Sequence, residues 1–315
     1  MVLFLGELLI DFMTNEPFKD SENYILKIGG SPGNIAKYLS MLGIPTKILS
    51  RVGNDPLGEK IKDNLQKFNV DISYIQIDDI YGTSIVFVQK TSSTPDFFVI
   101  RGADRFFEIP SSKIFDDVRI LHLSCWPISH KNNFEKTLSI VEQAIQRGIK
   151  VSFDPNCRNK LFDCRKISLE RVKEILSIST YTKPSFDDAI SIFGELDNGK
   201  YTLQDKAKYY IERFRESGVK NIVLTVGKDG AYVLFDELNY HVDVRTSNDI
   251  IHIPSQAKKV VDATGAGDGF WAGIYYGILN GKSFIEACNI GSKIAAHILK
   301  FVGADVPISI DILEG

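Results

Sequence analysis

The chain has 315 residues, of which 44% are hydrophobic and 24% are charged, and its formal net charge at pH 7 is −3. This length predicts one large domain with an appendage, or two domains. The charge balance excludes the strongly basic surface that most nucleic-acid-binding proteins carry. The first residues lack a cationic leader, and no apolar stretch reaches the roughly 20 residues that span a bilayer. We therefore expect a cytoplasmic protein whose partners are neither nucleic acids nor membranes. Its four cysteines lack the spacing of a zinc site, and we expect them to be reduced.

The chain opens with a predicted strand at 2–6 and soon reaches the run Gly-Gly-Ser-Pro-Gly-Asn at 29–34. Ser31 as the N-cap and Pro32 as the first helical residue are a strong helix start, and Gly43 is a suitable residue after the end. The apolar residues between them recur at helical spacing, so this helix is expected to pack one face on a core.

Three runs of residues without helices between them follow, and turn residues separate them. They predict strands at 73–77, 83–89 and 96–101. Together with 12–28, the segment 73–104 is expected to form a small β-sheet lid. The remaining segments, 1–11, 29–72 and 105–315, are assigned to the main α/β domain.

A short strand is expected at 46–50. From residue 120 onward, predicted strands and helices alternate. We expect strands at 120–124, 150–153, 181–182 and 222–226, and helices at 132–147, 169–178, 186–193, 203–217, 269–279 and 284–299. Such alternation predicts a parallel sheet with helices on both faces, which makes a three-layer α/β/α sandwich. Ligands of this architecture bind at the carboxyl ends of the strands.

The most informative stretch is Asp-Ala-Thr-Gly-Ala-Gly-Asp at 262–268. Val260 and Val261 before it are interpreted as a buried strand end, and the residues after it as a helix start. The small residues Gly265, Ala266 and Gly267 would then place free backbone amides at a helix N-terminus, which is an anion site. A carboxylate beside such a site suits a base that deprotonates a hydroxyl, and we assign this role to Asp268. The alternative is a tight turn with Asp268 as a helix cap.

These motifs resemble the ribokinase/PfkB family of carbohydrate kinases over nearly the whole chain. Gly29-Gly30 followed by Asn34 resembles the N-terminal sugar motif of the family, and residues 262–268 resemble its C-terminal signature. The resemblance implies a ribokinase-like fold and transfer of the γ-phosphoryl group of ATP to a sugar hydroxyl, with Mg²⁺. It also implies that Asp268 is the base and that the three amides before it stabilise the transferring group.

The resemblance places the sugar between the lid and the main domain. Asp11 and Asn34 would bond its hydroxyls, and Gly29 and Gly30 would let it approach the backbone. The alternatives are that Asp11 is a solvated loop residue and Asn34 a residue of a first helical turn. Arg101 and Asp104 resemble the lid segment of fructokinases and of 2-keto-3-deoxygluconate kinases, where the arginine would reach the substrate. An exposed charge pair at a hairpin end is the alternative.

The remaining site residues lie toward the phosphates. Arg158, in a cluster after a predicted strand, is interpreted as a clamp on the transferring phosphate or as a surface arginine beside a turn. Ser185 and Asp188 stand where the family has Asn and Glu, which govern Mg²⁺ and phosphate; both still offer oxygen ligands. Asp262, with the carbonyls of Thr264 and Gly303, matches the K⁺ position of family members, or Asp262 only bonds nearby amides. Thr225, Gly227, Gly230 and Asn289 match the nucleotide side, although Gly227 and Gly230 alone would make only a hairpin turn.

We expect fructokinase activity first, then 2-keto-3-deoxygluconate kinase activity, because Arg101 and Arg158 also suit a substrate carboxylate. Ribokinase and 5-dehydro-2-deoxygluconokinase activities come next. A sugar-binding protein that has lost catalysis is a different class and stays open. A Rossmann dehydrogenase is disfavoured, because no Gly-x-Gly-x-x-Gly run follows the first strand. Lid sheets of related enzymes form dimer contacts, so a homodimer through the lid is expected.

Overall fold

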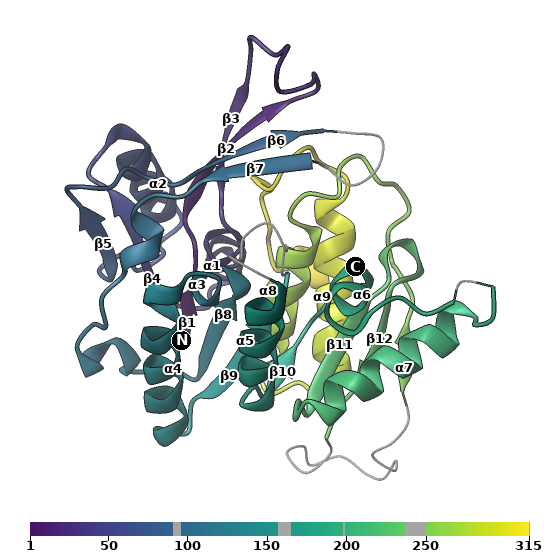
Figure 1. Cartoon of the computed structure of the whole chain (residues 1–315). Coiled ribbons are helices and arrows are strands. Elements are labelled where there is room, and N and C mark those ends of the chain that lie inside the picture. The colour runs from purple at the N-terminus through teal and green to yellow at the C-terminus, as the bar shows by residue number, and fades with distance from the viewer. Residues whose placement is uncertain (91–95, 157–164, 198, 237–249, 315) are drawn as a thin grey trace.

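The computed structural model describes residues 1–90, 96–156, 165–197, 199–236 and 250–314, and it contains two β-sheets (Figure 1). The large sheet has nine strands. In spatial order they are β13 (Ile251–Ile253), β12 (Ala231–Leu234), β11 (Asn221–Thr225), β10 (Tyr181–Thr182), β9 (Lys150–Asp154), β8 (Ile120–Ser124), β1 (Val2–Leu5), β4 (Thr46–Gly53) and β5 (Ile75–Asp78). All neighbours from β5 to β11 pair in parallel, and only β12 and β13 are antiparallel.

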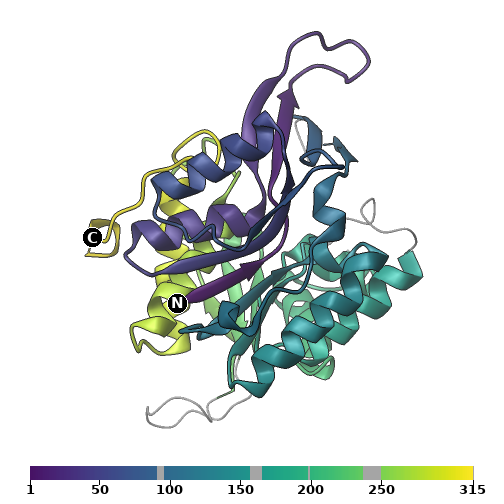
Figure 2. The ribbon, with the colours of Figure 1, turned by 90° about the vertical axis from the view of Figure 1, so that its left-hand side faces the viewer.

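Helices cover both faces of this sheet, as the alternation of elements predicted (Figure 2). One face carries α1 (Ser31–Met41), α2 (Pro56–Lys67), α8 (Ala266–Leu279) and α9 (Phe284–Ile298). The other carries α4 (Lys131–Gln146), α5 (Arg165–Ser177), α6 (Phe186–Phe193) and α7 (Leu203–Glu216). Shorter helical pieces are α3 (Cys125–Ile128), α10 (Asp311–Glu314), η1 (Ala103–Phe106), η2 (Ser112–Phe115) and η4 (Gly227–Asp229).

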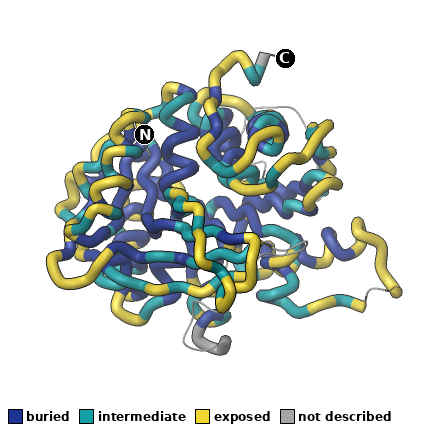
Figure 3. The backbone as a smooth tube through the Cα atoms, turned by 90° about the horizontal axis from the view of Figure 1, so that it is seen from above, coloured by how far each residue is buried: buried dark blue, intermediate teal, exposed yellow. Residues whose placement is uncertain are grey.

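The core consists of two apolar layers that the strands separate. In β1, Leu3 and Leu5 pack with the α4 to α7 layer, whereas Val2 and Phe4 pack with the α1, α2, α8 and α9 layer. Successive side chains of a strand point to opposite faces, so a central strand buried on both faces must be apolar throughout. Seen from above, buried segments run through the middle of the body and exposed segments lie around its rim (Figure 3).

The second sheet, which we call the lid sheet, lies above the body in Figure 1. Its four strands are β3 (Ile25–Gly29), β2 (Leu9–Thr14), β6 (Ile85–Gln89) and β7 (Asp96–Ile100), in this order. The expected strand at 73–77 does not belong to it, because β5 pairs with β4 at the edge of the large sheet. The lid sheet also includes residues 9–11 and Gly29, which we had assigned to the main domain. Strand pairing between distant segments, not local pattern, decides these assignments.

Three local expectations are wrong, and one helix was missed. Val260 and Val261 form no strand end and are 62% and 45% exposed. Ser31 is not the N-cap of α1, because Gly30 takes that position with φ of 105°. Helix α2 was not predicted, although Asp55 caps it and Pro56 starts it. Cys125 is disulfide-bonded and therefore not reduced.

Helices α8 and α9 pack closely through glycines of both helices. A Cβ atom on Gly273 would lie 2.5 Å from the Cα atom of Gly291, so any side chain there would push the helices apart. This contact buries the apolar length of α8 in the body. Within the described part of the chain, no helix is long and apolar enough to cross a membrane.

Candidate active site

Helix α8 begins with backbone amides that are open to a ligand. Its N-cap, Gly265, has φ of 80°, and a Cβ atom there would lie 2.8 Å from the Tyr38 hydroxyl oxygen, so only glycine fits. The Ala266 amide donates to the Ala263 carbonyl at 3.3 Å. In the described residues, the amides of Gly265 and Gly267 donate to no other group. Two of the three expected amides are therefore free at the positive end of the helix dipole, where anions bind.

Asp268, the third residue of α8, lies beside these amides. Its Oδ1 accepts a hydrogen bond from the Ser31 hydroxyl at 2.7 Å, and its Oδ2 accepts one from the Asn34 side-chain amide at 2.9 Å. Burial raises the pKa of Asp268, while these two hydrogen bonds and the ammonium groups of Lys183 and Lys37 lower it. A carboxylate with a raised pKa at a helix N-terminus suits a general base, because it accepts a proton more readily than an ordinary aspartate.

Lys183 was given no role by sequence reasoning, and the structure places it at the amides. It directly follows β10 and is only 4% exposed. Its Nζ lies 3.6 Å from the point that a Cβ atom on Gly267 would occupy, and 5.5 Å from the Trp271 ring centroid. No side chain or carbonyl in the described residues hydrogen-bonds this ammonium group. An ammonium group beside open amides is an arrangement that suits an anion.

Ser185 and Asp188 form a reciprocal cap at the start of α6. The Asp188 Oδ2 accepts hydrogen bonds from the Ser185 amide at 2.9 Å and from its hydroxyl at 2.6 Å. The Asp188 amide in turn donates to the Ser185 hydroxyl at 3.1 Å. The aspartate that replaces the family glutamate is therefore half committed to its own helix, and its Oδ1 accepts no hydrogen bond from the described residues.

Asp154, at the end of β9, adds a second carboxyl group near Asp188. Burial raises the pKa of Asp154 to about 6, with smaller raising effects from Asp188 and Asp268, and Lys183 opposes them. Asp154 ends β9, Lys183 follows the neighbouring β10, and Asp188 lies in the first turn of α6, so these groups share one edge of the sheet. Among the described residues, no three His, Cys, Asp or Glu side chains converge as a ready metal site.

Asp11 lies in β2 on the face of the lid that turns toward the body. It is next to Gly29, since a Cβ atom on Gly29 would lie 2.3 Å from the Asp11 Oδ2. Burial raises the pKa of Asp11 to about 7. No donor in the described residues bonds its carboxyl group. Asp11 is therefore not a solvated loop residue, and Asn34 is directed at Asp268, which links two of the predicted site residues.

Arg101 and Asp104 form a buried network and not an exposed charge pair. Their side chains are 12% and 2% exposed, and the guanidinium group donates to Asp104 through Nε at 2.9 Å and also through Nη2. Nη1 donates to the Ser129 hydroxyl at 2.5 Å. Asp104 also accepts hydrogen bonds from Ser84 and from the Trp126 indole, on which the guanidinium stacks. Asp104 thus orients Arg101, and its carboxylate has little capacity left for a substrate.

Asp262, Thr264 and Gly303 come together, as predicted, but through hydrogen bonds. Asp262 Oδ1 accepts from the Thr264 amide at 2.9 Å and from its hydroxyl at 2.7 Å, and Oδ2 accepts from the Gly303 amide at 3.1 Å. These bonds lower the pKa of Asp262 against the effect of burial, which raises it. The geometry agrees with the alternative that Asp262 bonds nearby backbone amides, and the Lys90 ammonium of the lid lies 3.7 Å from it.

The predicted nucleotide residues lie along one side of the sheet. Thr225 donates through its hydroxyl to the Pro184 carbonyl at 3.3 Å, next to Ser185. Gly230 contacts β13 so closely that a Cβ atom would lie 2.1 Å from the Ile253 carbonyl oxygen, and Gly227 begins the same turn. Asn289 is exposed on α9. Arg158 lies outside the described residues, and its predicted role stays a prediction.

Comparison with known proteins decides the family. The family model described as pfkB family carbohydrate kinase matches residues 1–311. The chain belongs to this family. A curated relative, the ATP-dependent 6-phosphofructokinase of Thermoanaerobacterium thermosaccharolyticum, is 33% identical over 98% of this chain and 90% of its own.

Solved structures agree with this assignment. The fructokinase of Halothermothrix orenii superposes with a TM-score of 0.80 at 31% identity, over 95% of this chain and 99% of that one. A Vibrio cholerae fructokinase variant with bound fructose, ADP and potassium has a TM-score of 0.78 at 22% identity, over 99% of this chain and 97% of that one. The second likeness shows the shared fold alone. The protein is thus a sugar phosphotransferase with the ribokinase fold.

In this pfkB kinase, helix α1 also holds the loop that faces Gly265. The Tyr38 hydroxyl donates to the Ala304 carbonyl at 2.6 Å, and the buried Lys37 ammonium donates to Asp305 at 2.9 Å. Local sequence patterns give no sign of these contacts, because they join segments more than 250 residues apart.

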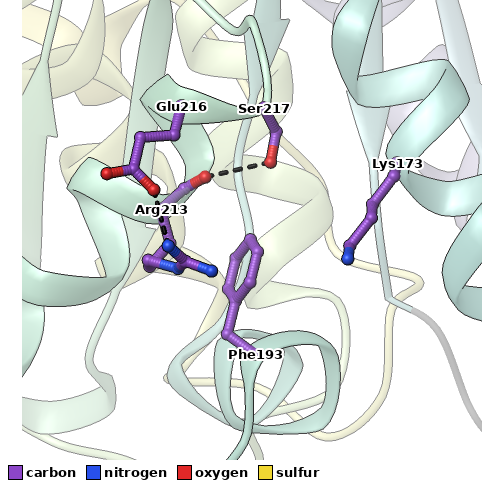
Figure 4. Close-up of a pocket in the computed structure, with 5 residues that line it drawn as sticks. All are labelled: Lys173, Phe193, Arg213, Glu216 and Ser217. Carbon is purple, nitrogen blue, oxygen red and sulfur yellow. Dashed lines mark hydrogen bonds and ion pairs between the residues drawn. The ribbon is translucent and has the colours of Figure 1, made fainter.

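A surface pocket of about 320 Å³ lies away from this chemistry (Figure 4). It is lined by Lys173, Phe193, Arg213, Glu216 and Ser217. Phe193 ends α6, and the α7 residues precede the start of β11, so the pocket lies toward the amino ends of the strands. The candidate site lies at their carboxyl ends, where proteins of this fold class bind ligands.

Proposed function

We propose that this kinase transfers the γ-phosphoryl group of ATP to a sugar hydroxyl with Asp268 as the general base. The carboxylate takes the hydroxyl proton, the sugar oxygen bonds to the γ-phosphorus, and the bond from that phosphorus to the bridging oxygen of ADP breaks. The free amides of Gly265 and Gly267 and the Lys183 ammonium stabilise the charge on the moving group. The observation that carries the proposal is the hydrogen-bonded Asp268 carboxylate beside open amides at the start of α8.

Fructose is the acceptor that we propose first. Asp11 offers a carboxyl group without a bonded donor, which suits the hydroxyls of a neutral sugar and repels a second negative charge. Arg101 already donates to Asp104 and Ser129, so it offers little to a substrate carboxylate. These contacts favour fructose over 2-keto-3-deoxygluconate. Ribose and 5-dehydro-2-deoxygluconate are further neutral or acidic alternatives within the same reaction.

Fructose 6-phosphate is a second candidate, because the relative that is 33% identical is named a 6-phosphofructokinase. Its phosphate would need a basic group near the lid. Lys27, paired in register with Asp11 and exposed, offers one charge there. We rank this acceptor second, because one exposed lysine binds a phosphate weakly.

Two cations belong to the proposal. Asp154 and the uncommitted Oδ1 of Asp188 suit a hydrated Mg²⁺, which takes one or two carboxylates together with substrate phosphates. When bound, Mg²⁺ neutralises phosphate charge. A K⁺ ion would need carbonyl oxygens of the loops around Thr264 and Gly303, which the Asp262 side chain holds together.

The outer face of the lid supports a homodimer. Phe12, Phe87 and Phe98 stack across three neighbouring strands, with ring centroids 5.4 Å and 4.7 Å apart, on the face opposite to Asp11. Phe98 and Ile100 are 43% and 54% exposed there. A second copy of the chain would cover this apolar surface. Light scattering should give a dimer mass for the wild type and a monomer mass for Phe98→Lys; a wild-type monomer at micromolar concentration would contradict the proposal.

A coupled assay of ADP release tests the function. Purified enzyme with ATP and Mg²⁺ receives fructose, fructose 6-phosphate, 2-keto-3-deoxygluconate, ribose or 5-dehydro-2-deoxygluconate, and kcat/KM is compared. We expect fructose to give the highest value. A higher kcat/KM for another sugar would make that sugar the proposed acceptor and would leave the proposed mechanism unchanged. Ligand-induced stabilisation without ADP release from any of them would leave a sugar-binding protein.

A further inference from the structure

Ser31 makes a contact that neither its helix nor the proposed reaction step explains. It is the first residue of α1, and the N-cap of that helix, Gly30, provides no side-chain cap. The Ser31 hydroxyl does not bond its own helix. It donates instead to Oδ1 of Asp268 at 2.7 Å, while Asn34 bonds Oδ2. With one donor on each oxygen, the plane of the carboxylate is fixed.

Glu7 in turn holds Ser31. It lies between β1 and β2 and is only 7% exposed. Its Oε1 accepts the Ser31 amide at 3.2 Å, and its Oε2 accepts the Ser124 hydroxyl at 2.6 Å. Gly6 allows this approach, since a Cβ atom there would lie 2.4 Å from the Pro32 Cγ. The ends of β1 and β8 and the start of α1 are therefore joined through one buried carboxyl group.

The same contacts appear in the electrostatics of the site. Burial raises the pKa of Glu7 to about 7, with a further contribution from the Asp268 charge, and the bonds from Ser124 and Ser31 oppose this. The Ser31 hydroxyl lowers the pKa of Asp268. The other charged or titratable groups facing Asp268 are Lys37 and Tyr38 of α1, Lys183 after β10, and Asp154 of β9.

We propose that Ser31 and Glu7 are positioning residues for the base: Glu7 fixes the Ser31 backbone, and the Ser31 hydroxyl fixes the orientation of the Asp268 carboxylate. This inference rests on the proposed role of Asp268. Neither residue touches the reacting atoms. Both set the direction in which a lone pair of the base faces the sugar hydroxyl, and proton transfer depends steeply on that geometry.

Steady-state kinetics of Ser31→Ala, from pH 5 to pH 9 at saturating ATP and sugar, test the first link. Loss of one charge-assisted hydrogen bond should lower kcat roughly 10-fold with nearly unchanged KM values. Because the hydroxyl lowers the pKa of Asp268, its removal should move the acid limb of kcat to higher pH. Ser40→Ala, which removes another α1 hydroxyl far from the base, is the control and should retain the wild-type profile.

A double-mutant cycle tests the second link. Glu7→Ala should lower kcat about as much as Ser31→Ala, and the double variant should be no worse than either, because both act through one contact. Glu7→Gln, whose side chain can still accept from the Ser31 amide, should lose less, roughly 3-fold. If Glu7→Ala does not fold, the kcat values of Ser31→Ala and Glu7→Gln still test the positioning roles of the two residues.

A wild-type kcat and acid limb in Ser31→Ala would overturn the proposal, and so would effects of Glu7→Ala and Ser31→Ala that multiply. The proposed function has a separate test, because Asp268→Asn must be inactive if Asp268 is the base. An inactive Asp268→Asn beside an unaffected Ser31→Ala would therefore reject only the positioning inference.

Discussion

The two parts of the proposed site, which we call the body wall and the lid wall, differ in how far their polar groups are already bonded. On the body, both carboxylate oxygens of Asp268 accept hydrogen bonds, and the Ser185 and Asp188 side chains bond each other. On the lid, the half-buried Asp11 carboxyl group has no donor among the described residues. Under the proposed function, the body is preorganised for charge that develops during reaction, whereas the lid keeps hydrogen-bonding capacity for the sugar. Changes in the body should therefore act on kcat, and changes in the lid on the KM of the sugar.

The largest expected effect is that of Asp268→Asn on the body wall. Removal of a general base lowers kcat by about 10² to 10⁴. Sugar affinity should change little, because Asn can still accept the hydrogen bond from Ser31. Stopped assays for kcat and calorimetric titration for sugar binding measure the two quantities. A variant with near-normal kcat would remove the base assignment.

Asp11→Ala on the lid wall should have the opposite effect, because it should change the sugar KM more than kcat. Loss of a hydrogen bond to a charged group should raise the sugar KM about 10-fold to 100-fold, with the KM for ATP within error of wild type. Asp20→Ala, an exposed lid carboxylate, is the matched control. Equal changes in both KM values would place Asp11 outside the sugar site.

Lys183→Met tests whether the ammonium group on the body wall acts on ATP. The buried ammonium faces the amides at the start of α8, so its loss should reduce kcat/KM for ATP about 10-fold while the sugar KM stays constant. The control is Lys220→Met, because Lys220 is exposed and directly precedes the amino end of β11. An unchanged kcat/KM for ATP would show that Lys183 only balances neighbouring carboxylates.

The smallest effect concerns stability. The pKa of Asp11 is about 7 in the folded protein and 3.8 as its ordinary value, so between these values the folded state binds more protons than the unfolded state. Stability from this group is therefore present below about pH 4 and is lost as pH rises through 7. Asp11→Asn should melt a few degrees higher than wild type at pH 8 and equally at pH 4. Equal melting temperatures at both pH values would show that Asp11 carries no burial penalty.

Local sequence patterns predicted the elements whose signals are local. Strand β8 and helix α6 have the predicted bounds, and the alternation of strands and helices gave the three layers. The position of β5 was missed, because the choice between two sheets depends on pairing with β4, far along the chain. Val260 and Val261 have strand propensity that their exposed loop overrides.

The candidate site likewise contains residues that a local motif predicts and residues that only the tertiary structure reveals. The motif at 262–268 predicted the helix start, the amides and the adjacent carboxylate. Lys183 and Glu7 carry no recognisable motif, and only tertiary packing makes them significant. Ser31 was interpreted from its usual preference for caps, but the backbone of Gly30 fills that position and leaves the hydroxyl for Asp268. Residues whose importance comes from burial and from distant partners are those that a single sequence does not reveal.

Helix α1 contacts both Asp268 and the loop beside the start of α8. One of its faces directs Asn34 to the base, while Lys37 and Tyr38 hold residues 304–305 beside Gly265. A substitution in this helix that retuned acceptor choice would also disturb the cradle for the migrating phosphoryl group. Under the proposed function, we expect a change of sugar preference through the lid strands to leave the hydrogen bonds of Asp268 intact, because those bonds come from α1.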